Sequence, residues 1–158
     1  MEQTKNRAKV QALRLLTVRD RSVQELRDRL EQRFSQEDTE EALEYVARMG
    51  YIDDLRVAEN HVRYRNRQRP TGNYLLRIEL RNKGIQDDYI DKVLNPPDLE
   101  YILALELGQQ RLPGLERLEK NVAVRRLHGL LERRGFPGSL ARRVVSELLD
   151  RDPENEYN

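Results

Sequence analysis

Apolar residues recur along the chain at spacings of three and four, and no segment alternates apolar and polar residues with a period of two. The first spacing places apolar side chains on one face of a helix, whereas alternation is the pattern of a half-buried strand. Glycine and proline are scarce, with 8 and 6 copies in 158 residues, and they separate the periodic segments. The pattern predicts an all-α protein of about nine helices.

Polar and helix-breaking residues place the predicted helix ends. The first helix is predicted over 5–18, and Ser22 with Glu25 has the form of a capping box that opens the second. Further helices are predicted to begin at the polar caps Ser35, Asp53, Thr71 and Asp98. Helices are predicted to end where glycine or proline interrupts the pattern, at Gly50, Pro70, Gly84, Pro96 and Gly135.

One set of landmarks occurs three times. Leu26, Leu76 and Leu127 are separated by 50 and 51 residues, and each is followed four residues later by another leucine. The second and third copies continue into Gly84-Ile85 and Gly135-Phe136, where glycine suits a helix end. The first copy has Arg33-Phe34 instead, so its turn is predicted to differ from the other two.

This recurrence predicts tandem three-helix repeats. A single unit of roughly 50 residues is marginally stable alone, but stacked units bury each other's flanks. We expect repeats over 1–50, 51–97 and 98–150, followed by a flexible polar tail over 151–158. The expected arrangement is an elongated, curved rod.

Composition fits small helical modules better than one large core. Charged residues make up 36% of the chain and hydrophobic residues 37%, against about 25% and 45–50% in typical globular domains. The absence of cysteine excludes disulfides and thiolate chemistry. No apolar stretch approaches a membrane span, and the N-terminal residues lack a signal-peptide pattern, so we expect a soluble protein that is not exported.

The net charge is only +1, but the charges are segregated. Residues 61–83 carry seven Lys/Arg against one acid, and residues 125–143 carry six against one. Two basic blocks on a nearly neutral chain indicate an anionic partner, because arginine forks suit phosphate and carboxylate groups. The alternative is that both blocks are solvated helix faces.

Catalytic and metal-binding patterns are absent from the sequence. It has no glycine-rich phosphate loop and no cluster with metal-ligand spacing. His61 and His128 are interpreted as ordinary helix residues, and Asp53-Asp54 as a helix cap rather than an acid–base pair. We therefore expect a binding protein, not an enzyme, with no cofactor and no metal.

Several fragments, in order and spacing, resemble the RecX family. They are Ala12-Leu13-Arg14-Leu15-Leu16 with Arg19-Asp20-Arg21-Ser22, Gly50-Tyr51-Ile52-Asp53-Asp54, Lys83-Gly84-Ile85, and Arg133-Arg134-Gly135-Phe136. The resemblance covers residues 12–148. It implies a bacterial cytoplasmic protein that binds filaments of the RecA recombinase along their groove. It further implies that the protein modulates, and usually inhibits, ATP hydrolysis, strand exchange and co-protease activity, in DNA repair and the SOS response.

The basic blocks supply the candidate partner-binding residues, because the resemblance does not assign individual contacts. These are Arg63, Arg65, Arg67, Arg69, Arg77, Arg81, Lys83, Arg125, Arg126, Arg133 and Arg134. The expected partners are the RecA filament and single- or double-stranded DNA, with the protein itself a monomer and no membrane involved. The alternative hypothesis is a helical nucleic-acid binder that acts without RecA.

Overall fold

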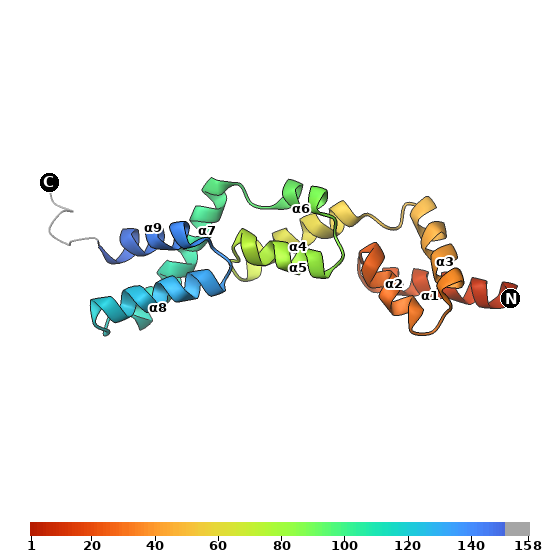
Figure 1. The fold of residues 1–158 in the computed structure, drawn as a ribbon, viewed down its shortest axis with the longest axis horizontal. Coiled ribbons are helices and arrows are strands. Elements are labelled where there is room, and N and C mark those ends of the chain that lie inside the picture. The colour runs from red at the N-terminus through yellow and green to blue at the C-terminus, as the bar shows by residue number, and fades with distance from the viewer. Residues whose placement is uncertain (151–158) are drawn as a thin grey trace. The chain divides into compact units, whose positions relative to one another are not determined.

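The structure is a computed structural model that describes residues 1–150, and all of its regular elements in that range are helical (Figure 1). The α-helices are α1 (Glu2–Val18), α2 (Val23–Glu31), α3 (Gln36–Arg48), α4 (Asp54–Gln68), α5 (Asn73–Asn82), α6 (Asp87–Val93), α7 (Pro97–Arg111), α8 (Lys120–Arg133) and α9 (Gly138–Leu149). A short 3-10 helix, η1 (Leu112–Gly114), follows α7. The predicted all-α class is confirmed. The tail predicted over 151–158 lies outside the described residues.

The chain divides into two compact units. The first unit contains residues 1–61 and 79–93, and the second contains 62–78 and the described residues from 94 onward. Helix α4 therefore begins in the first unit and ends in the second, whereas α5 begins in the second and ends in the first. The two ends of α4 therefore belong to different units, as do the two ends of α5.

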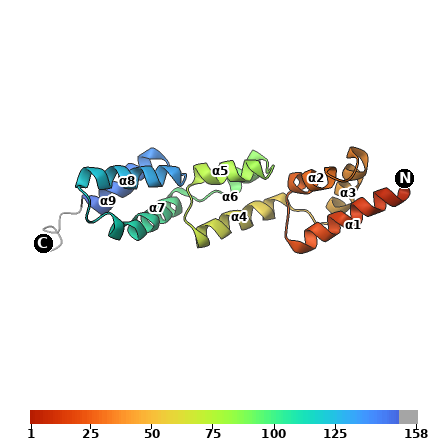
Figure 2. The ribbon, with the colours of Figure 1, turned by 90° about the horizontal axis from the view of Figure 1, so that it is seen from below.

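Helices α1, α2 and α3 form a bundle within the first unit (Figure 2). Its core contains Ala8 and Ala12 of α1, Leu26 and Leu30 of α2, and the buried face of α3. The alanines recur every four residues and leave room for the two leucines, which are fully buried. Phe34, in the turn after α2, is half-buried against this core.

Helices α7, α8 and α9 form the corresponding bundle of the second unit. Leu127 and Leu131 of α8 are fully buried, as are Ala141 and Val144 of α9. Phe136, in the turn after α8, is 2% exposed and closes this core. The leucines and the apolar residue after the turn thus do the same work in both bundles.

Glycine ends three helices with one hydrogen-bond pattern. Gly50, Gly84 and Gly135 have φ values of 74°, 77° and 90°, and no other described residue has a positive φ. After α5, the Ile85 N–H donates to the Leu80 carbonyl at 3.1 Å and the Gly84 N–H to the Arg81 carbonyl at 2.9 Å. This is the Schellman motif, and its recurrence after α3 and α8 confirms the predicted ends there.

The turn after α2 differs, as its sequence predicts. Gln32 stays in the right-handed helical region, and the Phe34 N–H donates to the Leu30 carbonyl at 2.9 Å. The chain reaches Ser35 one residue sooner than in the other repeats and needs no left-handed residue. Arg33 therefore occupies a position where the later repeats have glycine.

Two predicted caps are wrong. Thr71 does not cap α5, because its hydroxyl oxygen accepts from the Arg134 guanidinium at 3.1 Å and Gly72 precedes the helix. Asp98 does not cap α7, because Pro96 is the N-cap and Pro97 already belongs to the helix. Proline suits the first helical position, where its missing N–H is not needed. The predicted caps at Ser22, Ser35 and Asp53 are confirmed by their hydrogen bonds to backbone N–H groups.

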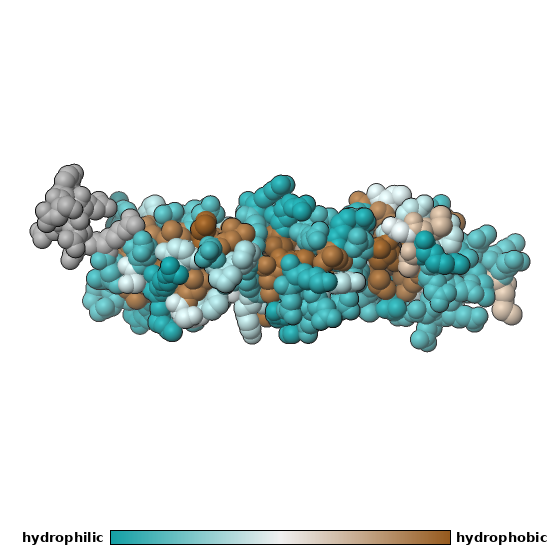
Figure 3. Space-filling model, turned by 90° about the horizontal axis from the view of Figure 1, so that it is seen from above, coloured by the Kyte–Doolittle hydropathy of each residue, from teal (hydrophilic) through white to brown (hydrophobic). Residues whose placement is uncertain are grey.

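Hydrophilic residues dominate the face drawn in Figure 3, with apolar side chains visible in patches between them. This agrees with the high charged fraction of the sequence. Within the described residues, no helix is both long enough and apolar enough to cross a membrane.

Candidate partner-binding site

The helices form three successive triplets, namely α1–α3, α4–α6 and α7–α9. Two sets of contacts, which we call joints, connect each triplet to the next, and several candidate residues lie at or near them. In the first joint, inside the first unit, the start of α2 meets the end of α5. The Ser22 hydroxyl caps α2 and also donates to the Lys83 carbonyl. The Val23 N–H, at the first turn of α2, donates to Asp54 Oδ1 at 2.9 Å.

The second joint, inside the second unit, brings the start of α5 to the end of α8. The Gly72 N–H donates to the Arg134 carbonyl at 2.7 Å, and the Tyr74 N–H donates to the Gly135 carbonyl at 3.1 Å. The Asn73 N–H donates to Glu100 Oε2 at 2.6 Å. In both joints, a carboxylate from the first helix of the following triplet therefore accepts a hydrogen bond from the N–H of the first residue of a helix.

Burial raises the pKa of both joint carboxyl groups. Desolvation is the largest cause for Asp54 and for Glu100, and the hydrogen bond from the Val23 or Asn73 N–H opposes it. The sequence predicts that Asp53-Asp54 caps the helix that it begins. Asp53 does cap α4, accepting from the Arg56 N–H at 3.0 Å, but Asp54 caps α2 of the preceding triplet instead.

Several of the predicted site residues take part in contacts within the chain, and Arg134, Arg81 and Lys83 are the first of them. The Arg134 guanidinium donates to the Arg69 and Pro70 carbonyls and to the Thr71 hydroxyl, at 3.3, 2.9 and 3.1 Å. Arg81 pairs with Asp87 at 2.9 Å, and Lys83 lies 3.7 Å from Glu25. Arg134 therefore serves the second joint, and the other two are already near carboxylates.

The remaining predicted residues all lie in the second unit. Arg65 and Arg77 are half-buried, whereas the others are exposed, namely Arg63, Arg67, Arg69, Arg125, Arg126 and Arg133. Arg63, Arg65 and Arg77 have interactions of their own within the described chain. The arginines most open to a partner are consequently at the end of α4 and along α8.

A hollow of about 420 Å³ brings two of these arginines together, and we call it the Arg126 hollow. Arg126 and Arg133 lie seven residues apart on α8, so both project from one face of the helix two turns apart. Arg111, from the last turn of α7, is a third basic wall, and the floor contains Leu115, Leu127 and Leu130. An aliphatic floor with an arginine rim suits a protein surface that offers an apolar side chain beside a carboxylate.

Sequence reasoning missed Arg111. It stands outside both basic blocks, and only the return of the chain through η1 places it near α8. Its position in the last turn of a helix was the available signal, but that position is also explained by the helix dipole. Arg142 and Arg143 belong to the second block but were not among the predicted site residues, and Arg143 lies over the Tyr101 ring at 4.1 Å.

The histidines and acids form no metal site in the part of the chain that the structure describes. No group of three or more possible ligands comes together there. His61 Nε2 lies 2.6 Å from Glu79 Oε2, which ties α4 to α5. His128 Nε2 is 3.9 Å from Glu132 on its own helix. The exposed arginines described above can bind anionic groups.

Comparison with known proteins agrees with this architecture. The model of the first three-helix domain of RecX matches residues 8–45, and that of the second matches residues 53–94. A regulatory protein RecX from Prosthecochloris aestuarii is 35% identical over 139 residues, covering 87% of this chain and 91% of the relative. The chain belongs to the RecX family. Another relative, a regulatory protein RecX from Mycolicibacterium smegmatis, is 37% identical over 93% of this chain and 82% of its own.

Solved structures confirm the fold of this RecX-family protein. A crystal structure of RecX from Lactobacillus salivarius superposes with a TM-score of 0.85 and covers 94% of this chain and 98% of its own, at 18% sequence identity. A second crystal structure, of a regulatory protein RecX, gives a TM-score of 0.82 over 94% of this chain. The predicted tandem three-helix repeat is therefore confirmed, as is the resemblance to the RecX family.

Proposed function

We propose that this RecX-family protein binds filaments of the RecA recombinase along their groove and inhibits filament extension, ATP hydrolysis, strand exchange and co-protease activity. The observation that carries the proposal is the match to RecX proteins over about nine-tenths of the chain. The names of these relatives say only that they are regulatory proteins. The assignment of RecA as the partner, and of the bacterial cytoplasm as the location, is the proposed step.

The joints support a mechanism without chemistry. The three triplets, which we propose as repeats over 1–50, 51–97 and 98–150, are connected by backbone hydrogen bonds and by bonds from backbone N–H groups to partly buried carboxylates. A chain of repeats offers several contact surfaces to a polymer whose own subunits repeat. Binding across neighbouring subunits would stabilise one filament geometry and oppose the changes that accompany ATP turnover.

We assign the strongest contact to the Arg126 hollow, with Arg67, Arg69 and Arg125 as further candidates and Arg63 as a weaker one. Arg126 and Arg133 are exposed, and they flank leucines that could accept an apolar side chain of the filament. An interface of this kind derives its affinity from a desolvated centre and its orientation from the surrounding charges. Arg81, Lys83 and Arg134 are proposed to act mainly through their contacts within the chain.

The test is ATP hydrolysis by RecA on single-stranded DNA, with this protein added at up to one molecule per RecA. We expect hydrolysis to fall at substoichiometric protein and to stay low when excess single-stranded DNA is supplied. Hydrolysis that recovers with excess DNA would mean that the protein merely sequesters the strand, which is the alternative function. Unchanged hydrolysis at equimolar protein would contradict both.

A further inference from the structure

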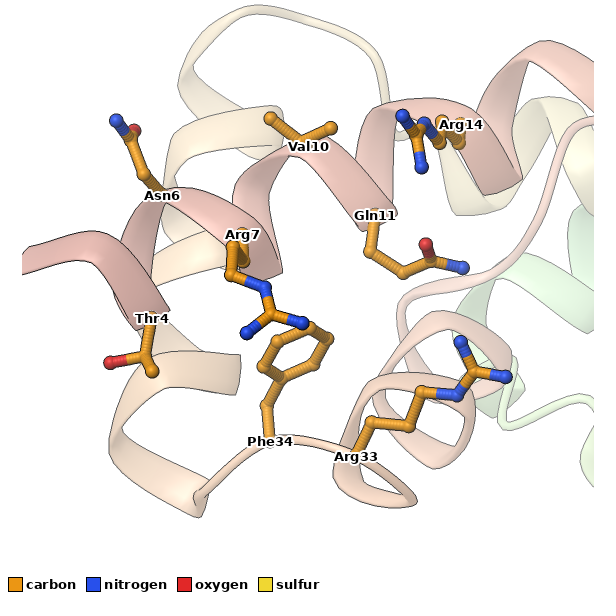
Figure 4. A pocket seen from close by; sticks show the side chains of 8 residues that line it. All are labelled: Thr4, Asn6, Arg7, Val10, Gln11, Arg14, Arg33 and Phe34. Atoms are coloured by element: carbon orange, nitrogen blue, oxygen red, sulfur yellow. The ribbon is translucent and has the colours of Figure 1, made fainter.

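A second basic hollow, of about 550 Å³, lies on the first bundle, outside both basic blocks of the sequence. We call it the Arg7 hollow. Its walls are one face of α1 and the turn after α2, and Arg7, Gln11, Arg33 and Phe34 project into the space between them (Figure 4). Thr4, Asn6, Val10 and Arg14 complete the lining. No carboxylate is among the lining residues.

The Arg7 hollow occupies the place where a joint would form if another repeat preceded the first. The first helix of each triplet has two buried small residues four positions apart, and these pairs align the three helices. The pairs are Ala8 and Ala12 in α1, Ala58 and Val62 in α4, and Ala104 and Gly108 in α7. This register makes Thr4 the counterpart of Asp54 and Glu100, the carboxylates that receive a helix N-terminus in the joints. Arg33 and Phe34 are likewise the counterparts of the helix ends at Gly84 and Gly135.

The charge of this surface is opposite to that of the joints. Threonine replaces the carboxylate, and arginine replaces the glycine that allows close backbone approach. A helix N-terminus carries a positive partial charge, so Arg7 and Arg33 would repel it. The surface is thus unsuited to another repeat and suited to an anion.

A second copy of the chain fits this surface poorly. The helices whose N-termini form the joints, α2 and α5, begin three residues before their first core leucine. Helix α2 begins at Val23 before Leu26, and α5 begins at Asn73 before Leu76. Helix α8 begins seven residues before Leu127, so it carries an extra turn at the end that would dock. The ends of the chain therefore do not match each other as the joints do.

Three arginines of the Arg7 hollow are available to a ligand. Arg7, Arg14 and Arg33 are exposed, and none has an ion pair or side-chain hydrogen bond within residues 1–150. Arg7 and Arg14 are seven residues apart on one helix face, about 10.5 Å along the axis, so they can reach different phosphates of one strand. Phe34 lines the same hollow as Arg7, so an aromatic side chain lies among the charges.

We propose that the Arg7 hollow is a binding site for single-stranded nucleic acid. Arg7, Arg14 and Arg33 contact the phosphates, the edge of Phe34 left exposed contacts a base, and the amides of Asn6 and Gln11 hydrogen-bond to base or sugar. Cations interleaved with an aromatic ring and neutral amides are typical of single-strand binding surfaces. The Arg126 hollow differs because its floor is aliphatic, which favours a protein partner. This inference does not rest on the proposed function.

The experiment measures binding of a fluorescent thymidine 20-mer to the whole protein by anisotropy, in the absence of RecA and across a salt series. The test variant is Arg7→Ala with Arg33→Ala. The matched control is Arg29→Ala with Arg48→Ala, which removes the same charge from exposed arginines of the same bundle. We expect the affinity for the 20-mer to fall at least tenfold in the test variant and less than threefold in the control. The slope of log K against log[salt] should be shallower by about 1.4 in the test variant, because two phosphate contacts are lost.

Phe34→Leu keeps an apolar side chain against the core and removes the aromatic face, so it should weaken binding several-fold while far-UV circular dichroism is unchanged. Equal losses in the test and control variants would overturn the proposal, because they would mean non-specific attraction. Binding of labelled polyglutamate that the test variant loses, with no binding of the 20-mer to the wild type, would overturn the proposal and assign the hollow to an acidic protein. Self-association that the test variant abolishes would assign it to a second copy.

Discussion

In the two joints, residues at equivalent positions donate the hydrogen bond, but they do so from different atoms. Ser22 and Gly72 precede α2 and α5 at equivalent places, and both approach the carbonyl of the residue before a helix-ending glycine. In the first joint the donor is the Ser22 side chain, whereas in the second it is the Gly72 backbone N–H. A Cβ on Gly72 would lie 2.2 Å from the Gly135 carbonyl carbon, so the second joint has no room for a side chain there.

The repeats therefore share a backbone arrangement, but equivalent positions do not tolerate the same substitutions. The first joint depends on a hydroxyl and can accommodate a Cβ, because Ser22 already has one. The second depends on direct contact between two backbone segments, with the Arg134 guanidinium holding the loop that precedes Gly72. Substitutions at equivalent positions should therefore have unequal effects.

The largest effect is expected from Gly72→Ala. The new methyl group would overlap the backbone of Gly135 and Phe136, which cannot move without disturbing the core of the second unit. We expect a loss of about 3 kcal/mol or more in the free energy of unfolding, measured by urea denaturation. Gly114→Ala is the control, because a Cβ added there would meet nothing within 4 Å, and it should change stability by less than about 0.5 kcal/mol. Equal effects would refute a close contact in the second joint.

Arg134→Ala should have the next largest effect. It removes three hydrogen bonds to the loop before α5 and leaves the Pro70 carbonyl and Thr71 hydroxyl without that donor. We expect a loss of about 1–3 kcal/mol in thermal or urea unfolding. The adjacent Arg133 is exposed, so Arg133→Ala removes the same charge and should cost less than about 0.5 kcal/mol. The reverse order of the two variants would show that Arg134 does not hold the second joint.

Ser22→Ala tests the first joint at smaller amplitude. Ser22 both caps α2 and donates to the Lys83 carbonyl, whereas Ser35 only caps α3. We expect about 2 kcal/mol for Ser22→Ala against about 1 kcal/mol for Ser35→Ala in denaturant unfolding. If the two losses were the same, the hydroxyl would contribute to its own helix and not to the joint.

The smallest effect concerns pH. Burial raises the pKa of Glu100 in the folded state, so its contribution to stability is complete below the unfolded-state pKa and is lost as pH rises through the folded-state pKa. Glu100→Gln keeps an acceptor for the Asn73 N–H but does not titrate. Between pH 4 and 7, the stability of the wild type relative to this variant should therefore fall as pH rises, in urea unfolding at each pH.

Glu40→Gln supplies the opposite sign. The hydrogen bond from Arg27 lowers the pKa of Glu40, so its contribution is present above the unfolded-state pKa and is lost as pH falls. Relative to Glu40→Gln, the wild type should gain stability as pH rises. Parallel pH profiles for the two variants would mean that the carboxylate of the second joint is not held in a buried setting.

The sequence predicted the helices, the threefold recurrence and the different turn at Arg33 because these are local. Leucine spacing, capping side chains and glycine at a helix end act within one or two turns. The joints were not predicted, because Asp54 and Glu100 act on helices 31 and 27 residues away in the chain. Thr71 looked like a cap for the same reason, since its competing partner Arg134 lies 63 residues further along the chain.

The candidate site was predicted in part. Charge segregation identified Arg126 and Arg133. It could not separate them from Arg134, whose guanidinium faces the chain itself, and it could not add Arg111 from another helix. The Arg7 hollow was missed because Arg7 and Arg14 lie on α1 and Arg33 lies in the turn after α2, so only the fold brings the three together.

The most direct measurement of the proposed function is binding of labelled RecA–single-stranded DNA filaments by the protein at fixed salt. The wild type is compared with Arg126→Ala plus Arg133→Ala, and with Arg117→Ala plus Arg142→Ala as an equal change of charge on exposed arginines of the same unit. We predict that the first pair weakens binding at least tenfold, about 1.4 kcal/mol, and that the second pair weakens it less than threefold. Undiminished filament binding by the first pair would contradict the assignment of the Arg126 hollow, and absence of binding by the wild type would contradict the proposed function.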